Sequence, residues 1–419
     1  MSDLRPIFRM WIAALCALLS ATALAAALPQ RAYVWQRAWT PTVRTAVAET
    51  GRNFAALDVL AAEISWRNGQ AATMSVAPDW AALRSHAHAV ALVVRVGPTA
   101  ATWAPDSPAT HAIVAACTQA LARAHAAGVE PTELQLDFDA ATARLAPYRE
   151  MLQLVRREVR PPRLVITTLP AWMGSPDFAA LIAETDGFVL QVHSLEKPAS
   201  RDAAFTLCDP AKARAWIERA AAFGRPFRVA LPAYGYRLAF DAVGKFTALE
   251  AEGEPRDWPA GFTTRVVLAD AAEISALVQQ LLASPPPHCE GIAWFRFPTA
   301  GDELAWSWPT LRAVMLGRAP RAQLTLVAQS VAGGTLELLE TNQGDASAEP
   351  AAFRLEWRDA RALATDGLAG WRVERDGAHA IIVRPPPHDT NGLLRPGESL
   401  RVGWLRLDRP AAVTAVPLH

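Results

Sequence analysis

Short runs of β-branched and aliphatic residues alternate with longer Ala-rich stretches from Arg31 onward. This alternation is typical of repeated βα units around a parallel sheet. Helices are expected between the runs at 109–127, 147–159, 210–223 and 271–282, several with Pro near the first turn. The runs themselves predict eight strands, at 33–39, 56–66, 90–96, 133–139, 164–169, 187–193, 227–234 and 291–297.

Eight successive βα units favour a closed arrangement. We therefore predict an α/β fold, a (β/α)₈ TIM barrel over residues 30–318. The structural alternative is a doubly wound open sheet. No Gly-rich phosphate turn follows the first predicted strand, so the closed barrel is preferred.

The pattern changes after a last predicted helix at 308–316. Turn residues such as Gly333-Gly334 and Asp376-Gly377 separate short strand-like runs with no helix between them. A small C-terminal β-sandwich is therefore expected over 320–419, either binding glycan or only packing against the barrel. Its strands are predicted at 324–328, 335–340, 352–357, 370–375, 379–383 and 400–407.

The first residues resemble an export signal. Arg5 and Arg9 precede an apolar run at 10–28, and the small residues at 23–25 offer a cleavage site. The sequence thus predicts a signal peptide over residues 1–26 and a periplasmic or secreted protein. The alternative is an uncleaved segment that anchors the chain in the inner membrane, which would be its only link to a membrane.

Composition narrows the range of partners and chemistries. Lys+Arg and Asp+Glu both number 41, and no basic stripe occurs that would bind a nucleic acid backbone. Cys16 lies in the predicted signal, and the spacing of Cys117, Cys208 and Cys289 fits no metal site and at most one disulfide. No nucleotide, zinc-hydrolase or serine-hydrolase motif is present, so no metal and no cofactor are expected. The 15 Trp residues fill cores, but their faces also stack on sugar rings.

Two acids at the end of the fourth predicted strand are the clearest chemical signal. Alternation along residues 133–139 sends Gln135, Asp137 and Asp139 into the barrel. Two carboxylates crowded in a partly desolvated site should raise one pKa, as acid/base chemistry requires. A structural alternative is that Asp139 caps the next helix or pairs with an Arg.

The other strand ends also carry polar and aromatic side chains, on the barrel face where active sites are built. Each has a structural explanation when taken singly, but together they predict a ligand pocket, because buried polar groups need partners. These residues are Glu63, Arg95, Trp172, Gln191, His193, Tyr234, Tyr236, Trp294 and Arg296.

Two family resemblances follow from these segments. Residues 132–139 are similar to the fourth-strand motif of chitinase-type family 18 glycoside hydrolases, Asp-Gly-x-Asp-x-Asp-x-Glu, and residues 291–295 to their last strand. The resemblance places Asp139 at the acid that protonates the leaving oxygen and Asp137 at the acid that steadies the intermediate. It also places Trp294 at the sugar-site floor. The chain departs from the motif, because Asp139 is one methylene shorter than Glu and Gln135 replaces an Asp.

Over nearly the whole mature chain, the sequence more closely resembles a bacterial family named domain of unknown function 3142. The segments that carry this resemblance are 134–139 (LQLDFD), 166–172 (ITTLPAW) and 231–236 (LPAYGY). It implies a glycosidase-like barrel with a β tail and no established reaction.

The hypothesis from the sequence is a glycoside hydrolase-like exported protein that acts on a polysaccharide or a peptidoglycan-derived glycan. Asp139 would be the general acid and Asp137 its electrostatic partner. The rival is a non-catalytic glycan-binding or envelope-assembly protein on a degenerate barrel. In the hypothesis the remaining pocket residues bind substrate: Gln135, Gln191, His193, Tyr234, Tyr236, Arg296, Glu63 and Arg95 by polar contacts, and Trp172 and Trp294 by stacking.

Overall fold

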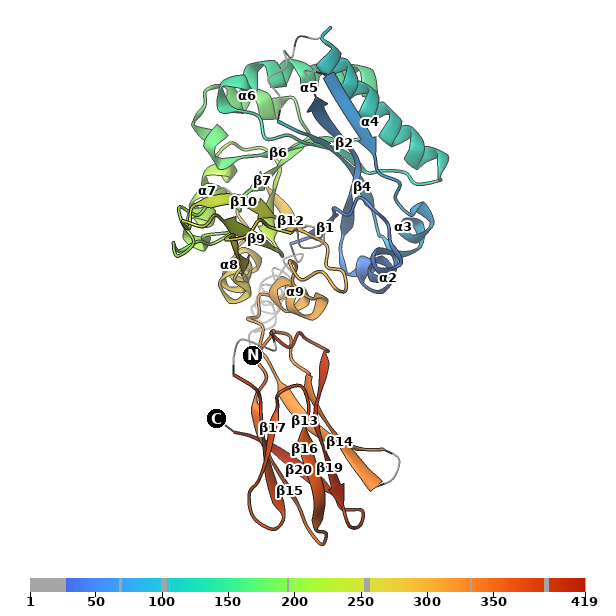
Figure 1. Ribbon diagram of the computed structural model, residues 1–419. Helices are drawn as coiled ribbons and strands as arrows, with labels where there is room; N and C mark the ends of the chain where they lie inside the picture. The colour runs from blue at the N-terminus through green and yellow to red at the C-terminus, as the bar shows by residue number, and fades with distance from the viewer. Residues whose placement is uncertain are drawn as a thin grey trace, which may run out of the picture.

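The computed structural model describes residues 28–67, 70–98, 104, 106–193, 196–251, 257–331, 334–387 and 392–418. It shows a barrel ringed by helices and a β-sandwich below it (Figure 1). The predicted signal at 1–26 lies outside the described residues. Within the described part, no helix is both long and apolar enough to cross a membrane.

The barrel is a closed parallel sheet. β1 pairs in parallel with both β2 and β12, which joins the two ends of the sheet. The α/β (β/α)₈ prediction is therefore confirmed. The barrel strands are β1 (Gln30–Val34), β2 (Ala56–Arg67), β4 (Val90–Val96), β5 (Glu133–Asp137), β6 (Leu164–Thr168), β7 (Gly187–Gln191), β8 (Phe227–Pro232) and β12 (Cys289–Phe295).

Local capping fixes where many of the surrounding helices begin. Ser107, Asp209 and Ser307 each accept a hydrogen bond from a backbone N–H of the first turn, and a Pro follows within two residues. The helices are α2 (Pro41–Thr50), α3 (Trp80–His86), α4 (Pro108–Ala126), α5 (Leu145–Val159), α6 (Asp177–Ala183), α7 (Pro210–Ala221), α8 (Ala271–Ala283) and α9 (Trp308–Met315), with 3₁₀ turns at Gly51–Asn53, Thr142–Arg144 and Pro170–Gly174.

Four strands in the barrel half were not predicted. β3 (Gln70–Ser75) forms an antiparallel hairpin with β2, and all its side chains are exposed. After β8 the chain forms an inserted sheet of β9 (Gly235–Phe240), β10 (Phe246–Glu250) and β11 (Thr263–Leu268). β10 and β11 alternate exposed with half-buried residues, so they lack the continuous apolar run that marks a barrel strand.

The first predicted strand, 33–39, starts three residues after β1 starts and ends five residues after β1 ends. Residues 33–39 were assigned to it, but β1 covers Gln30–Val34, and residues 35–39 form the loop to α2. Trp35 and Trp39 are buried there and extend the apolar pattern beyond the strand.

The C-terminal part forms two antiparallel sheets of four strands each, in the orders β13-β14-β19-β16 and β17-β18-β15-β20. β16 and β20 were not predicted because they contain no fully buried residue and so show no apolar face. The strands are β13 (Leu324–Ser330), β14 (Thr335–Asn342), β15 (Ala352–Trp357), β16 (Ala362–Gly367), β17 (Arg372–Arg375), β18 (Ala380–Arg384), β19 (Ser399–Leu407) and β20 (Val413–Leu418).

A charged cluster fills the lower barrel interior. Arg228 donates to both carboxylate oxygens of Glu133, and Arg31 donates to Asp58 and lies 3.8 Å from Glu133. Asp58, Glu133 and Arg228 are at most 4% exposed. Two cations therefore neutralise two anions beneath the pocket, as buried charges require.

Candidate functional site

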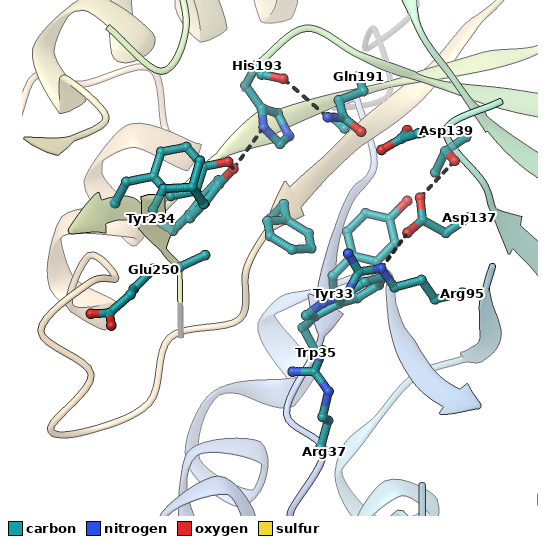
Figure 2. Close-up of a pocket in the computed structure, with 16 residues that line it drawn as sticks. Tyr33, Trp35, Arg37, Arg95, Asp137, Asp139, Gln191, His193, Tyr234 and Glu250 are labelled. Carbon is teal, nitrogen blue, oxygen red and sulfur yellow. Dashed lines mark hydrogen bonds and ion pairs between the residues drawn. The ribbon is translucent and has the colours of Figure 1, made fainter. Parts of the chain in front are cut away.

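A pocket of about 460 Å³ opens at the carboxyl ends of the barrel strands (Figure 2). Active sites of this fold lie at that end. β1, β4, β5, β6, β7, β8 and β12 all contribute to it, directly or through the loop that follows, and the inserted sheet forms one wall. The lining residues are Tyr33, Trp35, Arg37, Arg95, Asp137, Asp139, Thr167, Gln191, His193, Ala230, Tyr234, Tyr236, Leu249, Glu250, Ala251 and Phe295.

The acid pair lies on one wall of this pocket. Asp137 is the last residue of β5, with a side chain 19% exposed, and it accepts a hydrogen bond of 2.8 Å from Thr167 Oγ1. Burial and the neighbouring Asp139 carboxylate raise the pKa of Asp137 to about 6, against the opposing effect of Arg95, whose Nε lies 4.0 Å away. Asp137 thus holds a proton under mildly acidic conditions.

Asp139 lies in the loop after β5 and is exposed to the pocket. Its burial against the pocket wall raises its pKa, and Arg95 partly opposes this shift. Asp139 does not cap the following helix, because the residue before α5 is Arg144. It makes no hydrogen bond or ion pair with any residue that the structure describes, so its carboxyl group is available to a ligand.

A neutral histidine and two tyrosines occupy the opposite side. Tyr234 Oη lies 2.9 Å from Tyr236 Oη and 3.5 Å from His193 Nδ1. Gln191 Nε2 donates to the carbonyl of His193 at 3.3 Å. Burial lowers the pKa of His193 to about 3, so its imidazole is neutral and can both donate and accept. The ring of Phe295 stacks on His193 at 5.9 Å between centroids.

The β1 side carries an arginine pair. Arg37 Nη2 and Arg95 Nη1 donate to Glu63 Oε1 at 2.9 and 3.0 Å. Burial alone would raise the pKa of Glu63, but the two guanidinium groups hold it below its ordinary value. Arg95 also lies over the ring of Trp35 at 5.8 Å. Glu63 itself therefore positions the two arginines from outside the pocket lining.

Besides Glu63, four other predicted site residues do not line the pocket. Gln135 is fully buried below it, where Nε2 donates to Tyr33 Oη. Trp172 packs on Tyr148 and donates to the carbonyl of Ala140. Because both partners lie outside the barrel interior, this ring cannot stack on a ligand in the pocket.

Trp294 and Arg296 are also displaced from their predicted places. Trp294 is 0% exposed and donates to Gln30 Oε1, so Phe295, the next residue, is the aromatic that β12 presents to the pocket. Arg296 is 3% exposed and bonds Asp302 and the carbonyl of Ala251, which makes it a link between two loops. The parity predicted for this strand was off by one residue.

Several lining residues were missed from the sequence. Tyr33, Trp35 and Arg37 alternate along 33–37, a signal that could have been used, since this run had been identified as a strand. Leu249, Glu250 and Ala251 come from the inserted sheet, which the sequence did not reveal.

The described residues contain no group of three or more His, Cys, Asp or Glu side chains that could hold a metal ion. Cys117, Cys208 and Cys289 are all free thiols.

The chain is thus a closed (β/α)₈ barrel. Its pocket lies at the carboxyl ends of the strands and is lined by two acids, Asp137 and Asp139, and by three tyrosines. The chain belongs to the family described as domain of unknown function (DUF3142), which matches residues 90–300. This match includes both acids, His193 and the inserted sheet. No curated protein matches the chain significantly.

Solved structures with a similar fold include chitinases and a spore cortex-lytic enzyme. A chitinase from Chromobacterium violaceum ATCC 12472 has 15% identity and a TM-score of 0.48, covering 70% of this chain and 98% of that one. The spore cortex-lytic enzyme SleL from Bacillus megaterium QM B1551 has 11% identity and a TM-score of 0.46, covering 64% and 70%. Chitinase ChiA74 from Bacillus thuringiensis has 10% identity and a TM-score of 0.42, covering 93% and 100%.

Proposed function

We propose that this protein is an exported glycoside hydrolase that acts on a polysaccharide or a peptidoglycan-derived glycan. The observation that carries the proposal is the acid pair in the pocket, where Asp137 is buried beside Asp139 and has its pKa raised to about 6. Two neighbouring carboxyl groups, one protonated and one ionised, supply both the acid and the anion that glycoside hydrolysis needs.

In the proposed reaction Asp139 donates a proton to the glycosidic oxygen as the bond from that oxygen to the anomeric carbon breaks. The carboxylate of Asp137 stabilises the positive charge that develops on the sugar. A water molecule then bonds to the anomeric carbon and returns a proton to the acid pair, so the reaction consumes one water. Asp139 takes the acid role because its carboxyl group is the more exposed of the two, and burial raises its pKa as well. Before the glycosidic bond breaks, the proton that the resting pair holds on Asp137 passes to Asp139.

The departures from the family 18 motif shape this proposal. Gln135 cannot accept a proton, and its amide donates to Tyr33 Oη below the pocket. The proton therefore has to be exchanged between Asp137 and Asp139 alone. Sugar binding is assigned to Gln191, His193, Tyr234 and Tyr236 through hydrogen bonds, and to the ring of Phe295 in place of Trp172 and Trp294.

The test is hydrolysis of a glycan panel that includes β-1,4-linked glucans, N-acetylglucosamine oligomers and purified peptidoglycan. We expect the wild type to release reducing ends from at least one of them. Asp139→Asn should lower kcat at least about 100-fold, the effect typical of a lost general acid. Asp202→Asn is the matched control, since the Asp202 side chain is 84% exposed and does not line the pocket.

Two results would contradict the proposal. Turnover by Asp139→Asn at the wild-type rate would exclude the acid role of Asp139. Binding of a glycan without cleavage across the whole panel would favour the non-catalytic rival. Export is tested separately, by expressing the full-length chain and finding the cell fraction that contains it. The mass of the recovered protein then shows whether residues 1–26 are removed.

A further inference from the structure

A second cavity of about 530 Å³ adjoins the pocket that holds the acids. We call the acid pocket the first lobe and this cavity the second lobe. The second lobe lies between the loop that joins β1 to α2 and the loop that joins β12 to α9, with Arg237 of β9 at its side. Trp35 and Arg37 line both lobes, so the two cavities meet at these side chains.

The walls of the two lobes are also bonded to each other. Arg296 lines the second lobe, and its guanidinium donates both to Asp302 in that lobe and to the carbonyl of Ala251 in the first. Arg237 of the second lobe pairs with Glu250 of the first at 3.5 Å. The lobes therefore share one framework, and a ligand that extends from one into the other meets a fixed surface.

The chemistry of the second lobe differs from that of the first. The first lobe presents rings: Tyr33, Tyr234, Tyr236, His193 and Phe295. The second presents hydroxyl, amide and charged groups on a wall of small residues, with Trp35 as its one aromatic lining residue in the described chain. Its polar lining groups include Gln36, Thr40, Thr42, Thr299, Arg237 and Glu303.

We propose that the second lobe is a binding subsite for a further polyhydroxylated unit of the substrate, joined to the sugar held beside Asp137 and Asp139. This inference rests on the proposed function, since it takes the first lobe to hold a glycan. Hydroxyl, amide and charged side chains suit sugar hydroxyl groups, and a single aromatic ring would leave most of a cavity of about 530 Å³ empty. The substrate is then an oligosaccharide or polysaccharide that spans Arg37, and a small glycoside with an aromatic leaving group fills only the first lobe.

The test uses a bulky side chain that closes the second lobe and leaves the first intact. Ala300 lies on the wall of the second lobe and is exposed, and Ala300→Trp would fill it. Ala38→Trp would fill the second lobe from the opposite loop, so the test can still be interpreted if one of the two variants fails to fold. Ala222→Trp is the matched control, because Ala222 is an exposed alanine in a separate cavity beside α7 and α8.

The probes are di- to hexasaccharides of β-1,4-linked glucose and of N-acetylglucosamine, and the 4-nitrophenyl glycosides of the two sugars. We expect kcat/KM of the wild type to rise with chain length and to be lowest for the nitrophenyl glycoside. Ala300→Trp and Ala38→Trp should remove at least about tenfold of kcat/KM for the longer oligomers and leave the nitrophenyl glycoside unchanged. Ala222→Trp should match the wild type on every probe.

The same series is titrated calorimetrically into Asp139→Asn, with and without Ala300→Trp. The subsite is supported if affinity rises with oligosaccharide length and this rise is lost when the second lobe is filled. If this holds but no probe is cleaved, only the hydrolase proposal fails. Equal kcat/KM and equal affinity for all lengths, or unchanged values in both Trp variants, overturn the subsite while hydrolysis stands. If no oligosaccharide binds, both proposals are wrong.

Discussion

At the scale of single residues, the acid pair couples the pocket to stability. The folded protein raises the pKa of Asp137 from 3.8 to about 6. Between these values the folded state holds more protons than the unfolded state, so the free energy of unfolding falls as pH rises from about 4 to about 6. Above about pH 6 Asp137 is ionised, and Thr167 and Arg95 compensate its buried charge only in part.

Asp137→Asn should therefore stabilise the protein at neutral pH. The amide keeps an oxygen that accepts from Thr167 and carries no charge to bury. We expect the gain to be on the order of 2 kcal/mol at pH 7 to 8 and close to zero near pH 4. Chemical denaturation of both proteins at both pH values measures this difference in the free energy of unfolding. The low pKa of His193 affects both proteins equally, so its contribution cancels in the difference.

Asp202→Asn is again the control and should change stability at neither pH, since its side chain is 84% exposed. An Asp137→Asn variant that is less stable than wild type at pH 7 would mean that the charged form of Asp137 is well accommodated. The inference that the pKa of Asp137 is raised, and with it the inference that the acid pair holds one proton, would then be wrong.

At the scale of secondary structure elements, the sequence located the framework better than the pocket. β4 is predicted from its apolar run, because a parallel barrel strand is buried on both sides. The inward direction of the acids at the end of β5 is predicted from the alternation along that strand. The alternation failed at β12, where Phe295 and not Trp294 faces the pocket. A sequence of consecutive buried residues holds no information on which of them faces inward.

The inserted sheet shows a second limit of sequence reading. Its β10 contributes Leu249 and Glu250 to the pocket, yet the strand is half exposed and carries little apolar signal. The charged floor of the barrel was missed for a related reason. Arg31, Asp58, Glu133 and Arg228 come from four strands, and only the closed topology brings them together.

This cluster leads to a prediction about barrel stability. Arg228→Leu leaves Glu133, 1% exposed, without its bidentate partner. The free energy of unfolding should fall by about 3 to 5 kcal/mol, the cost typical of breaking a buried ion pair on one side. The double variant Arg228→Leu/Glu133→Leu should recover much of this loss, because it removes both buried charges.

Chemical denaturation of the two variants and the wild type tests this expectation. Arg157→Leu serves as the control, since the side chains of its ion pair with Glu158 are 64% and 51% exposed and the pair should contribute little. A double variant no more stable than the single one would contradict this expectation. The remaining Arg31–Asp58 pair would then need the negative charge of Glu133 for its stability more than the contacts indicate.

At the scale of the whole molecule, the sandwich is bonded to the barrel at the pocket-side loop. Arg395 donates to the carbonyl oxygens of Asp302 and Ala305 at 3.0 and 2.8 Å. Thr310 Oγ1 of α9 donates to the carbonyl of Asp345 at 2.7 Å. Trp357 and Trp371 are at most 4% exposed in the core of the sandwich, whereas Trp404 of β19 is half-buried. The contacts of Arg395 and Thr310 fit a supporting role, which the sequence leaves open beside glycan binding.

Arg395 supports both lobes through one short chain of contacts. It holds the backbone of Asp302, the Asp302 carboxylate holds Arg296 at 3.0 Å, and Arg296 holds the carbonyl of Ala251 in the first lobe. Arg395→Ala should therefore loosen residues 299–305 without unfolding either part. We expect hydrogen exchange in peptides covering 299–305 to speed up at least about tenfold, and the exchange of the barrel strands to stay unchanged.

Arg401→Ala is the matched control within the sandwich, since Arg401 is 60% exposed and pairs only with Glu337, at 3.4 Å, among the described contacts. It should leave the exchange of residues 299–305 as in the wild type. If Arg395→Ala behaved like this control, the loop would be held by the barrel alone, and the sandwich would have to be explained by some other role. If it accelerated exchange as expected, the wall of the second lobe would depend on a residue more than 90 positions from it in the chain.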